Sequence, residues 1–80
     1  MKDINDTMKK AGRKIAYHEL WMPDGSIVKL GVATVVDGVV ADVQPLKGEM
    51  PMTEWRGGTA QIKKDENGHL VLYEGDTIVY

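Results

Sequence analysis

The 80-residue sequence contains no cysteine and no phenylalanine, and it has a single serine. The absence of cysteine excludes the disulfide bonds and the cysteine-based zinc sites that stabilise many small domains. The chain also lacks an uninterrupted apolar run of about 18 residues, so no membrane-spanning helix is expected. Stability therefore has to come from the packing of apolar side chains, with or without the help of a partner.

The charge balance points to no particular partner. The formal net charge is −2, and 28% of the residues are charged, which suits a soluble globular chain and argues against a dedicated polyanion binder. The first twenty residues carry charged side chains throughout, so no secretory signal peptide is predicted. We expect a cytoplasmic protein that makes no membrane contact and folds as one small domain over residues 1–80.

The first fourteen residues differ from the rest. Residues 1–14 carry five positive and two negative charges, whereas residues 15–80 carry five positive and ten negative. Apolar residues in the first segment recur at spacings of 4, 3 and 4, which places them on one face of a helix. These residues are Ile4, Met8, Ala11 and Ile15. The pattern predicts a short basic amphipathic helix that covers one end of a sheet. A disordered basic tail, or an arm that contacts a membrane surface or nucleic acid, are the alternatives.

Residues 15–80 predict a mostly β domain, because they are rich in β-branched residues and contain three turn dipeptides. These dipeptides are Asp24-Gly25, Asp37-Gly38 and Asn67-Gly68. We expect a small meander of five to six antiparallel strands behind the helix, either barrel-like or strongly coiled.

The turns also predict strand registers. A two-residue turn at Asp37-Gly38 pairs Val36 with Val39, and further along it pairs Thr34 with Ala41 and Val32 with Val43. This register places Val32, Val36 and Leu30 on the core face. It leaves Val35 and Val40 on a second face, and the loop at Asn67-Gly68 places Val71 and Tyr73 on a second face as well.

The remaining turns are less uniform. Asp24-Gly25 is compatible with a two-residue turn or a three-residue loop, and a β-bulge near His18-Glu19 would let both halves of that strand bury their apolar residues. Asn67-Gly68 predicts a three-residue loop that pairs Ile62 with Leu72. A tight turn over residues 74–76 then sets Ile78 against Leu72.

One long connection, residues 45–58, has the sequence PLKGEMPMTEWRGG. Loops of more than about 12 residues are uncommon unless they are functional or disordered, and the apolar content of this loop argues against disorder. In one interpretation, Thr53 starts a single helical turn and the loop plugs the sheet with Trp55 inward. In the other, Met50, Met52, Trp55 and Arg56 form an exposed patch that binds a partner.

Catalytic chemistry has little support in the sequence. Ser26 follows the Asp24-Gly25 turn, where serine is ordinary turn material. His18 and His69 have no spacing that would place two metal ligands on one face. No glycine cluster precedes a helix in the way that phosphate-binding loops require. We therefore expect no enzymatic activity, no metal site and no cofactor.

The order of elements resembles that of the Sm-like small barrels. The closing sequence LVLYEGDTIVY is similar to the family's last motif, which also places a glycine and an aspartate between two strands. Asp24-Gly25 followed by Gly31 is similar to the first motif, with the glycine displaced by one residue. Glu74 stands where the family usually has a basic residue for RNA, and the aspartate and asparagine of its base-binding loop have no clear counterpart after Val36. The resemblance implies a barrel. Because of these departures, we do not assign the chain to the family.

The sequence does not determine the function. Our leading hypothesis is a non-enzymatic module that binds a protein partner or itself through residues 45–58 and an exposed strand edge. The alternative is a small nucleic-acid-binding β-barrel with basic side chains and one aromatic side chain for stacking. Its candidate residues are Lys2, Lys9, Lys10, Arg13, Lys14, Lys63, Lys64 and Tyr73.

Overall fold

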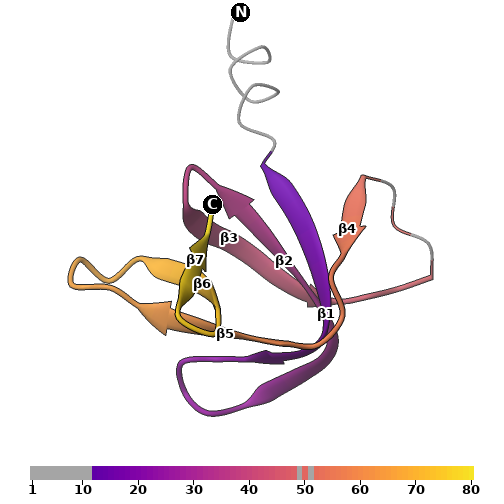
Figure 1. The fold of residues 1–80 in the computed structure, drawn as a ribbon, viewed down its shortest axis with the longest axis horizontal. Coiled ribbons are helices and arrows are strands. Elements are labelled where there is room, and N and C mark those ends of the chain that lie inside the picture. The colour runs from indigo at the N-terminus through magenta and orange to yellow at the C-terminus, as the bar shows by residue number, and fades with distance from the viewer. Residues whose placement is uncertain (1–11, 49, 51) are drawn as a thin grey trace, which may run out of the picture.

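The computed structural model describes residues 12–48, 50 and 52–80, and within these ranges the chain forms seven β-strands and no helix (Figure 1). The strands are β1 (Arg13–Trp21), β2 (Ile27–Val36), β3 (Val39–Pro45), β4 (Thr53–Trp55), β5 (Thr59–Lys64), β6 (Leu70–Glu74) and β7 (Thr77–Val79). The helix predicted near the N-terminus falls on residues 1–11, which lie outside the described residues, while Arg13 and Lys14 begin β1. The described ranges contain no helix long and apolar enough to cross a membrane.

The strands form one mixed, open sheet in the order β3-β2-β1-β5-β6-β7, with β4 also paired to β1. Both β4 and β5 run parallel to β1, whereas the other neighbouring strands are antiparallel. The predicted all-antiparallel meander is therefore wrong, because the chain leaves β3 at one edge and crosses to the far side of β1. The predicted barrel is also wrong, since β3 and β7 remain as the two ends of the sheet.

The main core lies between the two halves of the sheet. In Figure 1, β5–β7 lie on one side of β1–β3, and β4 lies on the other. Apolar side chains from both halves form one buried cluster. Its members are Ile15, Tyr17, Leu20, Ala33, Val35, Val40, Ala60, Ile62, Leu72 and Val79. The two halves are joined by the pairing of β1 with β5, and β3 does not pair with β7, so the sheet stays open. The apolar side chains of each half are nevertheless buried by those of the other.

The β2–β3 hairpin has the predicted turn but a different register. Positive φ angles of 53° at Asp37 and 80° at Gly38 fit a type I′ turn, and Val36 pairs with Val39 as predicted. Beyond the next pair, however, the register shifts by one residue between Thr34 and Val35. The predicted pairs of Thr34 with Ala41 and of Val32 with Val43 are therefore wrong, because a β-bulge inserts one extra residue into β3.

The assignment of the core face of this hairpin is also wrong. Val35 and Val40, predicted on the second face, belong to the main core, whereas Leu30 is exposed. Val32 is buried, but it lies outside the main cluster. The bulge in β3 lets both Val40 and Val43 pack toward the core despite their odd spacing.

The β1–β2 hairpin resolves the ambiguity at Asp24-Gly25. The backbone N–H of Met22 donates to the carbonyl of Ser26 at 2.8 Å, so the loop has three residues. The predicted bulge is confirmed, because the N–H groups of His18 and Glu19 both donate to the carbonyl of Gly58. At this point the β1 residues of the main cluster change from odd positions, Ile15 and Tyr17, to the even position of Leu20.

The predicted register is correct for the β5–β6 hairpin and wrong for the β6–β7 hairpin. Ile62 pairs with Leu72 and Gly68 has a φ of 85°, as the three-residue loop required. In the final hairpin Leu72 pairs with Val79 rather than with Ile78, so the predicted register there is wrong by one residue. The turn contains two residues rather than three, because Glu74 pairs directly with Thr77.

Gly31 supplies a test of the packing between β1 and β2. A Cβ atom at this position would lie 2.8 Å from Leu20 Cδ1 and 3.0 Å from Val28 Cγ1. We expect Gly31→Ala to lower the free energy of unfolding by about 1–2 kcal/mol, because Leu20 would have to leave its packed position. Chemical denaturation of both proteins measures this difference. Equal stability would mean that Leu20 has free space to move.

Candidate functional site

A second apolar face lies on the side of β1–β3 that is opposite the main core. Ala16 and Val32 pair with each other across β1 and β2 and are 1% and 0% exposed, yet neither belongs to the main cluster. Trp55 of β4 pairs with Ala16, so its side chain lies on this face. The backbone N–H of Leu46 donates to the carbonyl of Leu30, which continues the β2–β3 ladder one residue beyond β3. Among the described residues, Trp55 therefore lies against this second face.

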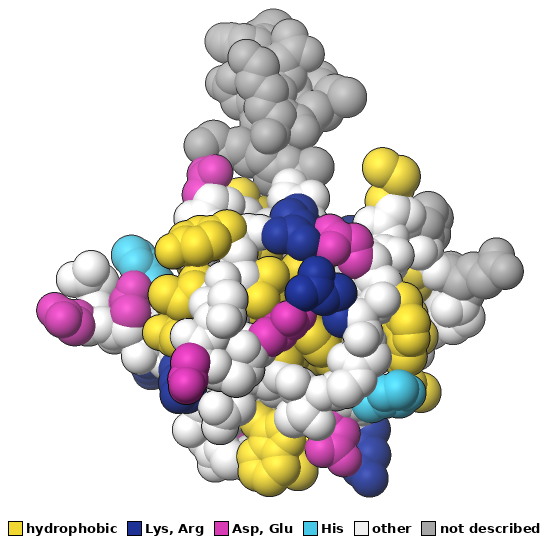
Figure 2. Space-filling model, viewed as in Figure 1, with side chains coloured by type: hydrophobic (Ala, Val, Ile, Leu, Met, Phe, Trp, Pro, Cys, Tyr) yellow, Lys and Arg dark blue, Asp and Glu magenta, His cyan; other side chains and the backbone are white. Residues whose placement is uncertain are grey.

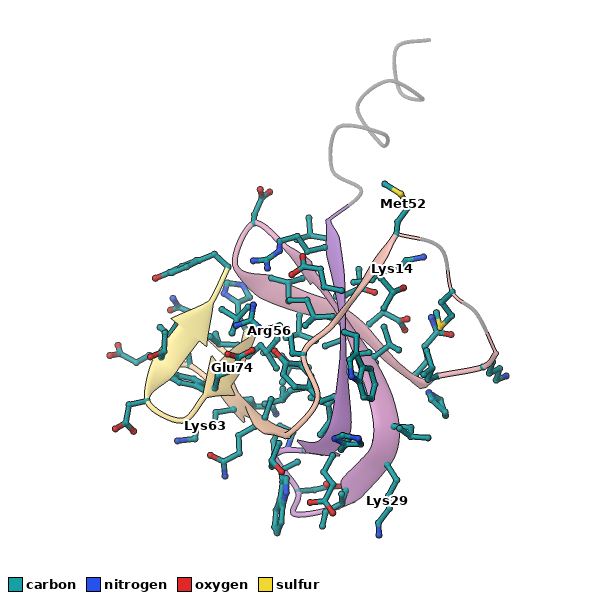
Figure 3. The ribbon with its side chains drawn as sticks, turned by 45° about the vertical axis from the view of Figure 1, so that its right-hand side comes forward. Lys14, Lys29, Met52, Arg56, Lys63 and Glu74 are labelled. Atoms are coloured by element: carbon teal, nitrogen blue, oxygen red, sulfur yellow. The ribbon has the colours of Figure 1, made fainter. Side chains whose placement is uncertain are left out.

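Trp55 is exposed on this face, and two further exposed apolar side chains lie in the adjoining segments, Leu30 in β2 and Met52 directly before β4. We call Leu30, Met52 and Trp55 the Trp55 patch. Their exposed fractions are 45%, 91% and 53%. The His18 ring packs edge-on against Trp55 with 4.9 Å between ring centroids. In Figure 3, Met52 points away from the sheet at the start of β4. Half of the Trp55 ring is thus held in place while the rest faces solvent.

The chain around Trp55 is positioned by the edge of β1. The N–H of Arg56 donates to the carbonyl of Ala16 at 2.9 Å, immediately after β4. Gly57 and Gly58 then take φ angles of 69° and 62°, a conformation that other residues rarely adopt. The N–H of Gly58 also donates to Nδ1 of His18 at 3.1 Å, which fixes the imidazole beside Trp55.

The structure separates the four residues predicted to bind a partner. Met52 and Trp55 are exposed in the patch, and Met50 is only half-exposed. The helical turn predicted at Thr53 is wrong, because Thr53–Trp55 forms β4. Sequence reasoning missed Leu30 as a member of the patch; the φ of 51° that accompanies its outward position leaves no signal in the sequence.

Arg56, the fourth predicted residue, belongs to a polar network on the core side (Figure 3). Its Nη2 donates to Oε1 of Glu74 at 2.7 Å, and the Tyr17 hydroxyl donates to Oε2 of the same carboxylate at 2.6 Å. The Tyr17 hydroxyl and the Arg56 guanidinium hold the pKa of Glu74 below its usual value. Burial, followed by the bond to Glu74, raises the pKa of Tyr17. This network closes one end of the core, and Arg56 is occupied within it.

A second ion pair lies next to this network. Arg13 forms two hydrogen bonds with Glu54, of 2.9 and 2.8 Å, and a further one with the carbonyl of Tyr80. The guanidinium keeps the pKa of Glu54 below its usual value. In Figure 2, basic and acidic side chains adjoin each other at the centre of this face. Arg13, a candidate nucleic-acid contact, is thus already paired with a carboxylate.

The other candidate nucleic-acid residues do not gather on one surface. Lys63 lies over the ring of Tyr73, with Nζ 5.0 Å from its centroid, so these two are together. Lys64 follows Lys63 in β5 and therefore faces the other side of the sheet. Lys14 and Lys63 lie on opposite sides of the domain in Figure 3. Lys2, Lys9 and Lys10 lie outside the described residues.

The residues considered for catalysis have local structural roles. The hydroxyl and the N–H of Ser26 both donate to Oδ1 of Asp24, which stabilises the β1–β2 turn. Asp65 accepts from the N–H groups of Asn67 and His69 in the β5–β6 turn, and these bonds lower its pKa. Within the described ranges, no three histidine, cysteine or acidic side chains are grouped to hold a metal ion.

In comparisons with known proteins, no family model, no curated protein and no solved structure matches the chain.

Proposed function

We propose that this domain is a non-enzymatic interaction module that binds a second copy of its own chain through the Trp55 patch. The observation that supports the proposal is the exposure of Trp55 and Met52 on a strand fixed to β1. Tryptophan is enriched among residues that dominate binding energy, and methionine adapts to irregular surfaces. An 80-residue chain has few apolar side chains to leave in solvent without such a use.

The size of the patch fits the centre of an interface. At their exposed fractions the three side chains offer on the order of 400 Å² of apolar surface, and patches of this size on soluble monomers are often binding sites. A stable interface buries about 800 Å² on each partner. The patch would supply the apolar centre, and the polar residues around it would form the rim.

The surroundings of the patch suit contact with an identical surface. Glu19 and Lys29 oppose each other across β1 and β2, on the side of the sheet that carries Ala16. A two-fold axis brings the same surface of two copies together, so neighbouring charges of opposite sign can pair in both directions. A net charge of only −2 opposes this association weakly.

Sedimentation equilibrium of the full chain tests the proposal. We expect a mass above that of one 8.9 kDa chain as the concentration approaches about 1 mM, and we expect Trp55→Ser to weaken association at least tenfold. Trp55→Ser should lower the free energy of unfolding by only about 1–2 kcal/mol, because about half of the ring is already exposed. Truncation of a fully buried tryptophan would cost roughly 3–5 kcal/mol.

Tyr80→Ser is the control. Tyr80 is 70% exposed, and its carbonyl accepts from Arg13, which pairs with Glu54 on the side of β4 opposite Trp55. Loss of this exposed aromatic ring should therefore leave self-association within about threefold of the original. Self-association would be disproved by a mass of one chain at the highest concentration. If Trp55→Ser instead costs as much stability as loss of a buried tryptophan, the plug interpretation is correct.

A further inference from the structure

A separate groove opens on the core side of the sheet, beside the outer edge of β3. Its volume is about 270 Å³, and its lining is mostly apolar. The lining residues are Met22, Val40, Ala41, Asp42, Val43 and Leu70. Sites for drug-sized ligands usually have volumes of about 300–1,000 Å³, so this groove suits a few side chains of a peptide better than a whole small molecule.

The edge of β3 can supply backbone hydrogen bonds to a peptide. Among the described strands, β3 pairs only with β2, so its outer edge has no hydrogen-bonded partner strand there, although β6 lies nearby and contributes Leu70 to the groove. In an antiparallel pair, alternate residues of an edge strand direct their N–H and C=O groups outward. An extended peptide can use these groups to add a strand to the sheet. Pro45 has no N–H group, so pairing is confined to residues 39–44 and the Pro45 carbonyl.

The charge on this edge selects the kind of peptide. Asp42 is exposed at the rim of the groove, and its side chain faces the side of the sheet opposite that of its neighbour Val43, which packs toward the core. It makes no ion pair with any residue in the described part of the chain. Two β3 strands in register around this residue would bring two aspartates together, which disfavours a second copy of this strand as the occupant. A cationic side chain in the ligand would instead complement the carboxylate.

We propose that the outer edge of β3 and its groove bind an extended peptide in which apolar residues alternate with lysine or arginine. Apolar side chains enter the groove beside Val40 and Val43. The alternating cations point to the other side of the sheet, where Asp42 lies in register with Thr34. The groove lies on the core side of the sheet, opposite the Trp55 patch. Asp42 and the cations lie on the side that carries Trp55, but at the outer edge of β3, whereas β4 pairs with β1.

The probe is a blocked seven-residue peptide in which valine alternates with lysine, titrated into the isotope-labelled full chain and followed by amide chemical shifts. We expect shift changes at residues 39–45, Met22 and Leu70, with a dissociation constant between roughly 10 µM and 1 mM. Asp42→Lys should weaken binding by about fivefold and should improve binding of the matched valine–glutamate peptide. Methylation of alternate peptide amides should weaken binding at least tenfold, because it blocks strand addition.

Two control variants locate the effect. Asp76→Lys makes the same charge change in the β6–β7 turn, outside the groove, and Trp55→Ser removes the self-association patch; both should bind the probe within about twofold of the original chain. The peptide site is refuted by an absence of shifts at about 1 mM, by shifts centred on Trp55, or by equal binding of the two peptides. A doubling of mass with shifts at β3 and no peptide present would assign the edge to a second copy instead.

Discussion

Replacement of Leu72 by alanine is expected to lower the free energy of unfolding by about 2–5 kcal/mol. Leu72 lies in β6 and is 0% exposed, because it packs into the cluster formed with β1, β2 and β5. Truncation removes buried methyl groups and leaves a cavity that the surrounding strands cannot fill completely. Urea denaturation, followed by tryptophan fluorescence and circular dichroism, measures the change.

Leu70→Ala is the matched control for this substitution. Leu70 has the same side chain in the same strand, but it is half-buried at the rim of the groove, so its truncation should cost about 1 kcal/mol. Fluorescence and circular dichroism should report the same transition for all three proteins, because both halves of the sheet share one core. Equal costs for the two leucines, or two separate transitions, would contradict this packing.

The parts of the fold that the sequence predicted are those fixed by local backbone geometry. Asp37-Gly38 and Asn67-Gly68 supply residues that tolerate positive φ, and both turns formed with the predicted loop length. The change of phase in β1 at His18-Glu19 was also visible, because apolar residues move from odd to even positions there. These features depend only on residues close together in the chain.

The parts that failed depend on contacts between distant residues. β4 contains three residues and exists as a strand because the edge of β1, about forty residues earlier, supplies its partner. The parallel placement of β4 and β5 follows from a crossover that no dipeptide encodes. The bulge in β3 shifted the register only beyond the Val35–Val40 pair. Packing against β5–β7, which are distant in sequence, decided which face of the β2–β3 hairpin is buried and placed Val35 and Val40 in the core.

The candidate site shows the same division. Met52 and Trp55 were recognisable because large apolar side chains in a long loop need either a core or a partner, and both are exposed. Arg56 follows Trp55 in sequence, but its side chain pairs with Glu74 on the other side of the sheet. The support that His18 gives to Trp55 was missed, and the only sequence signal near it is the Gly57-Gly58 pair that lets the chain approach the imidazole.

Replacement of Tyr17 by phenylalanine is expected to lower the free energy of unfolding by about 1.5–3 kcal/mol near neutral pH, because the lost hydrogen bond has a charged acceptor. Tyr17 is 1% exposed, and its hydroxyl donates to the carboxylate of Glu74. Tyr73→Phe is the matched control: the Tyr73 ring is half-buried, and its contact with Lys63 would persist in phenylalanine. That control should change stability by less than about 0.5 kcal/mol.

The pH dependence of stability separates this hydrogen bond from simple packing. The folded-state pKa of Tyr17 is raised, so its contribution is complete below the ordinary tyrosine value of about 10 and is lost as pH rises above it. The pKa of Glu74 is lowered, first by the Tyr17 hydroxyl and then by Arg56, so its contribution is present above about pH 4.5 and is lost as pH falls. Denaturation from pH 3 to pH 11 should therefore show both losses in the original chain. In Tyr17→Phe the alkaline loss should be reduced, because burial of the hydroxyl is the first cause of the raised pKa of Tyr17. The acid loss should also be shallower, because the hydroxyl no longer lowers the pKa of Glu74, and an unchanged acid loss would show that the hydroxyl does not act through Glu74.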